Sequence, residues 1–237
     1  YFAAYGDNRE LRIGKQIHAW GAVDANSPLD FLNPIDYYYL FTDSDETKIG
    51  KFSILLDLYL NDLKLEFLMM PKHIANNIPS GDPDFPITLP ATVEDYQFLD
   101  QIKQPEIGAY IQKSFDQADL ALYYFSGYDR NFNLYGANVF LDDFDINSVT
   151  DTVFSYRKTN MTALSFAGFN DDFTVRFDLA HFKSNATNQS IDNREYRGSD
   201  PISEYLNFDN LSANSYFNIS GEYYQLNMQL ECTLPYD

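Results

Sequence analysis

Apolar and polar residues alternate with a period of two along six stretches of the chain. These stretches are residues 10–20, 52–60, 63–69, 106–112, 173–179 and 225–231. Successive side chains of a β-strand point to opposite faces, so each stretch predicts a strand with one apolar and one polar face. Three further runs, 119–127, 152–169 and 214–222, also favour strands, although their faces are ambiguous. The pattern therefore predicts about nine strands.

The connections between these strands alternate between very short and very long. Three short links consist of turn-forming residues, namely 61–62, 116–117 and 170–172. The long links are residues 21–50, 72–104, 128–151 and 183–213. Loops in compact soluble domains are mostly ~4–6 residues long, and loops beyond ~12–15 residues are uncommon. Transmembrane β-barrels do show this asymmetry, with short turns on one side of the membrane and long loops on the other.

We therefore expect an all-β fold, an antiparallel transmembrane β-barrel with short turns on one side and long loops on the other. Several predicted strands have about the ~9–11 residues that cross a bilayer. We expect a single β-barrel domain over residues 1–237, incomplete at both ends and part of a larger barrel, since intact bacterial barrels usually have an even strand number. A soluble β-sandwich or soluble barrel stays open, because the period of two alone does not distinguish them.

Composition narrows the function classes. The chain carries 16 Lys and Arg against 35 Asp and Glu, a formal net charge of −19, which excludes a basic nucleic-acid-binding protein. The 19 Tyr and 20 Phe favour strands. A single cysteine, Cys232, excludes an internal disulfide and a cysteine-based metal cluster.

No constellation of residues predicts catalysis or a bound cofactor. None of the three histidines has a second histidine at metal-binding spacing, and Cys232 shares the apolar phase of its strand. We expect no enzymatic activity, no cofactor and no high-affinity metal site. Asp143, Asp145 and Asn147 match the start of a calcium loop, but Ser148 and Phe154 replace its glycine and its bidentate glutamate. Weak Ca²⁺ binding at these three residues is left open.

The polar faces of the predicted strands carry charges of both signs. In a barrel these faces line the lumen, where they are expected to set solute selectivity. The expected lumen residues are Arg12, Gln16, His18, Asp57, Lys64, Glu66, Glu106, Arg176, Asp178 and Glu231. The alternative is that these residues only pair across strands and fill the lumen.

Residues 11–36 resemble a pattern found in porin-like outer-membrane proteins of Gram-negative bacteria, an uncharacterised family. The residues that carry the resemblance are Gly14, Lys15, Gln16, Trp20, Gly21, Asp24, Asn33, Pro34 and Asp36. Residues 157–169 with 175–180 are similar to the family's middle hairpin, where the position of Asp178 is more usually Glu, and 214–232 look like the following hairpin. The resemblance implies an outer-membrane β-barrel and a channel or transporter, and it supplies no substrate.

The same residues have physical roles of their own. Gly14 leaves room for a large side chain of a neighbouring strand or for a bend, and Trp20 suits an aromatic girdle at the membrane interface. Gly21 lets the chain turn, and Asn33-Pro34 with Asp36 fits a loop that folds back into the lumen as a constriction. These residues could equally serve only to fix strand and loop geometry.

We expect an outer-membrane channel that passes small solutes through a polar lumen. Its partners would be outer-membrane lipid and small solutes, with homo-oligomerisation left open. The alternatives are a non-conducting outer-membrane barrel that presents loops for adhesion or assembly, and a soluble secreted β-protein that binds glycans.

Overall fold

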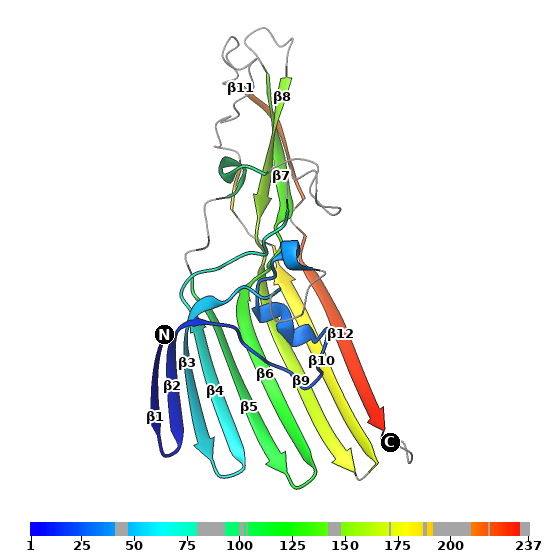
Figure 1. The fold of residues 1–237 in the computed structure, drawn as a ribbon. Helices are drawn as coiled ribbons and strands as arrows, with labels where there is room; N and C mark the ends of the chain where they lie inside the picture. Colours follow the sequence, from blue (N-terminus) through cyan, green and yellow to red (C-terminus); the bar gives the residue numbers. More distant parts are fainter. Residues whose placement is uncertain are drawn as a thin grey trace.

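The computed structural model describes residues 1–40, 47–79, 93–99, 102, 104–141, 148–170, 172–186, 189–191, 210–217 and 219–232. Most of them lie in one broad antiparallel sheet (Figure 1). Its strands are β1 (Phe2–Gly6), β2 (Arg9–Gln16), β3 (Lys51–Leu60), β4 (Leu63–Met70), β5 (Glu106–Phe115), β6 (Ala118–Tyr128), β9 (Lys158–Asn170), β10 (Phe173–Asn185) and β12 (Gly221–Cys232). They pair in the order β1-β2-β3-β4-β5-β6-β9-β10-β12. The antiparallel all-β prediction is confirmed, but the described sheet is open, with β1 and β12 as its edges, and is not a closed barrel.

The turns of this sheet follow the predicted asymmetry. The three predicted hairpins, β3–β4, β5–β6 and β9–β10, are confirmed, and a fourth joins β1 to β2. All four turns lie at the same end of the sheet in Figure 1, and the long connections lie at the other. Asn61, in the first of the predicted turns, adopts a positive φ of 54°, which asparagine tolerates better than most residues.

A second, three-stranded sheet projects beyond the end with the long connections (Figure 1). It consists of β7 (Asn133–Leu141), β8 (Ser148–Ser155) and β11 (Asn210–Tyr216), in the order β11-β7-β8. The predicted link 128–151 is therefore wrong in part, because it contains β7 and the start of β8. The run 152–169 divides into β8 and β9, and the run 214–222 spans the end of β11 and the start of β12. β7 contains Gly136 and Asn138, which weaken a strand signal, and pairing on both sides overrides this weak propensity.

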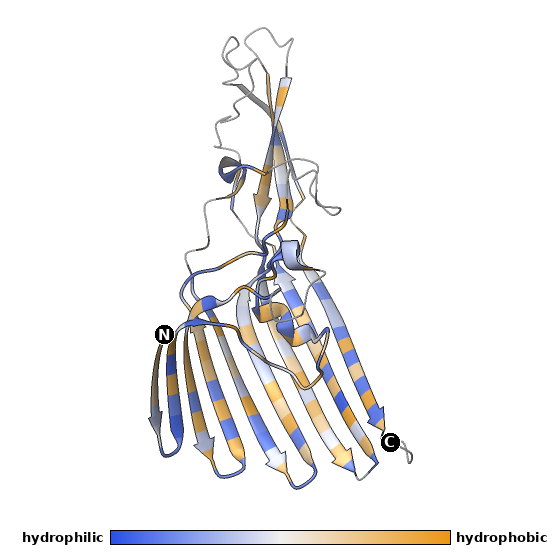
Figure 2. Cartoon of the chain, in the orientation of Figure 1, coloured by the Kyte–Doolittle hydropathy of each residue, from blue (hydrophilic) through white to orange (hydrophobic). Residues whose placement is uncertain are grey.

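The nine-stranded sheet has two faces of opposite character. The outer face carries Phe52, Leu122 and Leu226, which are 54%, 56% and 57% exposed. The inner face carries Asp57, Glu106 and Asp178, which are all 0% exposed. Figure 2 shows the resulting alternation of polar and apolar bands along the strands. A half-buried sheet in water normally has its apolar face covered and its polar face solvated. Here the uncovered face is the apolar one, and the covered face carries buried charges beside a hydrophobic core, an arrangement called reversed polarity below.

Residues 17–36, here called the crossing segment, lie against the inner face. The segment leaves β2 after Gln16, four residues before the predicted strand end, and contains the short 3₁₀ helix η1 (Pro28–Leu32). Figure 1 shows η1 in front of the sheet, and its contacts are with β10 and β12. Two further 3₁₀ helices are η2 (Tyr37–Tyr39) and η3 (Asp95–Gln97). Among the described residues, no helix combines the length and hydropathy needed to span a membrane.

A hydrophobic core lies between the crossing segment and the inner face. Leu29 and Leu32 are fully buried there with Phe125, Met161 and other inner-face residues. Trp20 joins this core and is only 5% exposed, so its predicted place in an exposed aromatic girdle is wrong. A Cβ at Gly108 would lie 2.6 Å from the Trp20 ring, so the missing side chain on β5 makes room for the indole. The indole stays inside because its N–H also has a buried acceptor, described below.

Candidate functional site

The ten residues predicted to line a lumen gather on one side of the sheet. Nine of them project from the inner face, and His18 lies on the crossing segment that covers it. Gln16 bonds β3, with Nε2 donating to Ser53 Oγ at 3.0 Å. The other nine lie in or next to four charge clusters, which are centred on Asp57, Glu106, Asp178 and Arg176. The register of the strands brings these residues onto one face, and the burial of their side chains differs between the clusters.

Asp57 is the centre of the first cluster, on β2–β4. Arg12 Nη2 donates to Asp57 Oδ2 at 2.6 Å, and Lys64 Nζ lies 3.2 Å from the other carboxylate oxygen. Lys64 also lies 3.5 Å from Glu66 Oε2. Trp20 Nε1 donates to Glu66 Oε1 at 2.7 Å, which ties the crossing segment to β4. Glu10 Oε1 also lies 3.2 Å from Arg12 Nε, so two cations serve three carboxylates here, and each buried carboxylate has a cation beside it.

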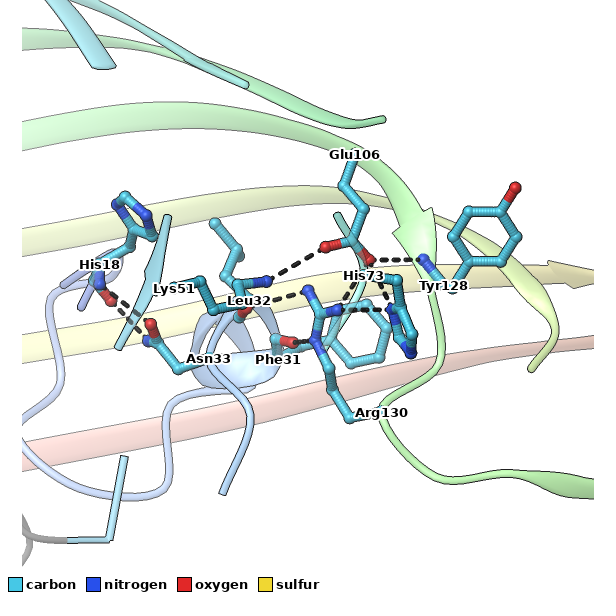
Figure 3. Close-up of polar contacts among 9 residues, drawn as sticks. All are labelled: His18, Phe31, Leu32, Asn33, Lys51, His73, Glu106, Tyr128 and Arg130. Carbon is cyan, nitrogen blue, oxygen red and sulfur yellow. Dashed lines mark hydrogen bonds and ion pairs between the residues drawn. The ribbon is translucent and has the colours of Figure 1, made fainter. Parts of the chain in front are cut away.

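Glu106 is the centre of the second cluster (Figure 3). Arg130 Nη1 lies 2.7 Å from Glu106 Oε1, Lys51 Nζ lies 3.1 Å from Oε2, and His73 Nδ1 lies 3.1 Å from Oε1. The backbone N–H of Tyr128 also donates to Oε1 at 3.2 Å. Every side chain in this cluster is almost fully buried.

Arg130 connects this cluster to the crossing segment. Its Nε donates to the carbonyl of Phe31 at 3.2 Å, and its Nη2 donates to the carbonyl of Leu32 at 2.9 Å (Figure 3). These are the last carbonyls of η1, which a short helix leaves without internal partners. One guanidinium therefore joins a buried carboxylate of the sheet to the end of the helix that covers it.

Sequence reasoning did not identify Lys51, His73 or Arg130. Lys51 is in phase with Ser53 and Asp57 on β3, so the period of two carried a signal for its inner-face position. His73 and Arg130 lie just beyond strand ends, in segments without periodicity, and only the folded structure brings them to Glu106.

Asp178 holds the start of the crossing segment. Its carboxylate accepts hydrogen bonds from the backbone N–H of Ala22 at 2.9 Å and from Ser27 Oγ at 2.7 Å. It also accepts from the Ser165 hydroxyl of β9. Gly21 has a φ of +102°, and a Cβ there would lie 2.5 Å from Asp178 Oδ2. Glycine is required at this position both by backbone conformation and by space.

The other motif residues position the same segment. Asn33 accepts from the backbone N–H of His18 at 2.9 Å and donates to the His18 carbonyl at 2.6 Å, so one amide closes the segment into a loop. Asp36 caps η2 by accepting from Tyr38 N–H. Asp24 pairs with Arg176 at 2.5 Å, and Arg176 also lies 3.1 Å from Glu231. Pro34 is buried, and Lys15 is exposed.

Gly14 allows close approach of β1. Its φ is +142°, and a Cβ there would lie 2.8 Å from the Tyr1 Cα. Gly14 was expected to leave room for a large side chain of a neighbouring strand or for a bend, and the group that closely approaches it is the backbone of Tyr1.

Burial shifts the pKa of several titratable side chains that lie outside the strands. Burial lowers the pKa of His18 to about 4, and the nearby Lys51, Arg12 and Arg130 act in the same direction. His18 is therefore neutral at pH 7. Burial also lowers the pKa of His73, although the bond to Glu106 opposes this shift. The pKa of Asp129 is raised by burial, against the hydrogen bond from Thr159.

A cavity of about 920 Å³ opens beside the crossing segment. It lies between residues 24–35, the 129–133 segment and the inner-face side chains of β10 and β12. Its lining contains amides, hydroxyls, paired charges and the aromatic rings of Phe31, Phe182 and Tyr223. A cavity lined by such a mixture can hold a polar solute through hydrogen bonds and ring contacts.

The described residues hold no group of three histidine, cysteine, aspartate or glutamate side chains arranged for a metal ion. Asp143, Asp145 and Asn147, where weak Ca²⁺ binding was left open, lie outside the described residues. Cys232 is an exposed free thiol in phase with Leu230 on the outer face.

Comparison of the chain with protein-family models, with curated proteins and with solved structures finds no match. The functional argument therefore rests on the two faces of the sheet and on the crossing segment.

The Glu106 cluster generates a stability prediction. Glu106→Gln removes the charge that faces Lys51 and Arg130 and leaves two buried cations short of a partner. We expect a loss of about 3–5 kcal/mol in the free energy of unfolding, measured by urea denaturation. The matched control is Glu231→Gln, because the Glu231 side chain is 50% exposed and its ion pair should contribute less than about 1 kcal/mol. Equal losses for the two variants would contradict the central role of Glu106.

His18 generates a pH prediction. Its folded pKa of about 4 lies below the unfolded value of 6.5, so the unfolded chain binds more protons between these pH values. The free energy of unfolding should therefore be highest above pH 6.5 and fall by about 3 kcal/mol as the pH drops towards 4. His18→Asn should make this pH dependence shallower, whereas Leu226→Ala, which removes no titratable group and lies on the outer face, should leave it as in the parent. If the free energy of unfolding of His18→Asn depended on pH as in the parent, the assignment of this dependence to His18 would be refuted.

Proposed function

We propose that this chain forms part of the wall of an outer-membrane β-barrel channel that passes small solutes by diffusion. The observation that carries the proposal is the reversed polarity of the nine-stranded sheet. Part of its charged face is covered by the crossing segment, and its apolar face is exposed across the sheet. Lipid is the environment that suits the second face, and a polar lumen suits the first.

The exposed apolar face is hard to reconcile with a monomer in water. Soluble monomers rarely expose contiguous apolar patches larger than a few hundred Å². Here Phe52, Phe67, Ile107, Leu122 and Leu226 lie on five different strands of one face and are all exposed. No second layer covers them within the described part of the chain. This disfavours the soluble glycan-binding alternative, in which a core would bury this face.

Strand length supports the same proposal. A strand tilted in a bilayer needs ~9–11 residues to cross the hydrocarbon region. β3 and β5 have 10 residues each, β6 has 11 and β12 has 12. The short turns at one end and the long connections at the other match the two sides of an outer-membrane barrel.

In this proposal the crossing segment is a constriction inside the lumen. Asp178 holds it in place directly, and Glu106 does so through Arg130. These two carboxylates and that of Asp57 are fully buried, so a solute has no access to them. Selectivity then belongs to charged groups that remain accessible. Arg176, Asp24 and Glu231 form such a group, with side-chain exposures of 26%, 66% and 50%.

A non-conducting barrel is the second candidate. The crossing segment covers part of the inner face, and the β7–β8–β11 sheet projects beyond the main sheet, as a surface element for adhesion or assembly would. Ion conductance distinguishes the two candidates.

The proposal predicts a change of conductance when the constriction is released. The intact parent protein, reconstituted into planar bilayers, should show discrete single-channel currents. Asp178→Asn weakens the hydrogen bonds from Ala22 and Ser27 that hold the crossing segment. Because the released segment narrows the lumen less, single-channel conductance should rise about twofold. Asp119→Asn is the control, because Asp119 lies on the inner face of β6 and its carboxylate makes no hydrogen bond or ion pair with the described part of the crossing segment.

Absence of any current from correctly inserted protein would overturn the channel and leave the non-conducting barrel. Equal conductance in Asp178→Asn and Asp119→Asn would contradict the constriction role of residues 17–36.

A further inference from the structure

The cavity beside the crossing segment has a lining that favours one chemical class of solute. Its volume of about 920 Å³ falls within the ~300–1,000 Å³ typical of small-molecule pockets. Three features of the lining are informative: the pairing of its charges, its neutral hydrogen-bonding groups and its aromatic rings.

The charges of the lining cancel. Three acids and three bases line the cavity: Asp24, Asp30, Asp129, Lys48, Arg130 and Arg157. Lys48 pairs with Asp30 at 2.8 Å, and Asp24 pairs with Arg176 at 2.5 Å. Arg130 pairs with Glu106 and donates hydrogen bonds to two carbonyls of η1. Arg157 interacts electrostatically with Asp129. A charged solute would therefore have to break an existing pair, and the cavity offers it no net opposite charge.

The neutral groups are amides and hydroxyls, which donate and accept hydrogen bonds alike. The amide side chains of the lining are those of Asn26, Asn33, Asn76, Asn131, Asn133 and Gln225. Several of them hold the surrounding loops, as Asn33 does with His18. Gln225 is exposed, and its side-chain amide makes no hydrogen bond to another described residue, so that amide is available to a solute.

An aromatic platform lies next to Gln225. Tyr223 and Phe182 stack with ring centroids 4.8 Å apart and ring planes 18° apart. Phe31 packs edge-on against Phe182 at 5.2 Å. Phe182 is buried, whereas Tyr223 is 48% exposed, so the Tyr223 ring has both firm support and an open surface. Such a ring offers apolar area to the C–H face of a sugar, while its hydroxyl remains a polar handle.

We propose that this cavity is a binding subsite for a neutral, polyhydroxylated solute, a short saccharide, with Tyr223 as the stacking residue and Gln225 as a hydrogen-bonding residue. The inference rests on the proposed function in placing the cavity on a solute path. Binding itself, however, can be measured without transport.

The test is calorimetric titration of the detergent-solubilised intact protein with maltotriose, cellotriose and raffinose, and with trigalacturonate as a charged probe. At least one neutral trisaccharide should bind, and trigalacturonate should bind at least tenfold more weakly. Tyr223→Ala should weaken neutral-sugar binding about tenfold. Tyr224→Ala is the matched control, because Tyr224 is the next residue of β12 and lies on the outer face, where it is 71% exposed.

A second pair of variants guards against a folding defect in Tyr223→Ala. Gln225→Ala should weaken binding about threefold, and Leu226→Ala, on the outer face, should leave it unchanged. The subsite is refuted if no neutral trisaccharide binds, if trigalacturonate binds as tightly, or if both inner-face variants match their outer-face controls.

The outcomes for the two proposals are distinguishable. If the intact protein binds sugar, Tyr223→Ala loses this binding and no ion current is observed, the subsite is supported and the channel is overturned. Ion current without sugar binding supports the channel and overturns the subsite.

Discussion

The buried carboxylates of the inner face are the constraint on which the rest of the structure depends. A carboxylate removed from water must be paired and hydrogen-bonded, or the protein loses several kcal/mol. Strand neighbours meet part of this need, as Arg12 and Lys64 do for Asp57. Asp178 and Glu106 draw the remainder from the crossing segment and from Arg130. The path of residues 17–36 is thus determined by electrostatics as much as by the core of Trp20, Leu29 and Leu32.

The same arrangement accounts for the covered face of the sheet. The inner face gains its core and the hydrogen bonds to Asp178 from the crossing segment, whereas strand neighbours and Arg130 pair most of its charges. The outer face remains an exposed apolar surface, with Phe52, Leu122 and Leu226 among its residues. The proposed membrane environment stabilises that surface, and the proposed lumen accommodates the other. The proposed neutral-solute subsite agrees with this charge pairing, because the ion pairs around the crossing segment leave few unpaired charged side chains in the cavity beside it.

The period of two predicted the strands whose faces alternate cleanly and the inner-face position of residues such as Asp57 and Asp178, and the turn-forming residues between these strands predicted their hairpins. It did not predict β7 or the division between β8 and β9, where Gly136, Asn138 and long-range pairing decide the structure. Trp20 was misplaced because its partners, Glu66 and Gly108, lie on strands distant in sequence. His73 and Arg130 join the Glu106 cluster from irregular segments, and no local pattern marks such positions.

The most direct test of the central claim measures which face of the sheet contacts lipid. In a Cys232→Ser background, Leu226→Cys and Gln225→Cys place a fluorescent label on opposite faces of β12. The account predicts that, in reconstituted bilayers, a nitroxide-bearing lipid quenches the label at position 226, whereas aqueous iodide quenches the label at position 225. Efficient iodide quenching at both positions, with no effect of the nitroxide lipid, would contradict the membrane-facing assignment of the outer face.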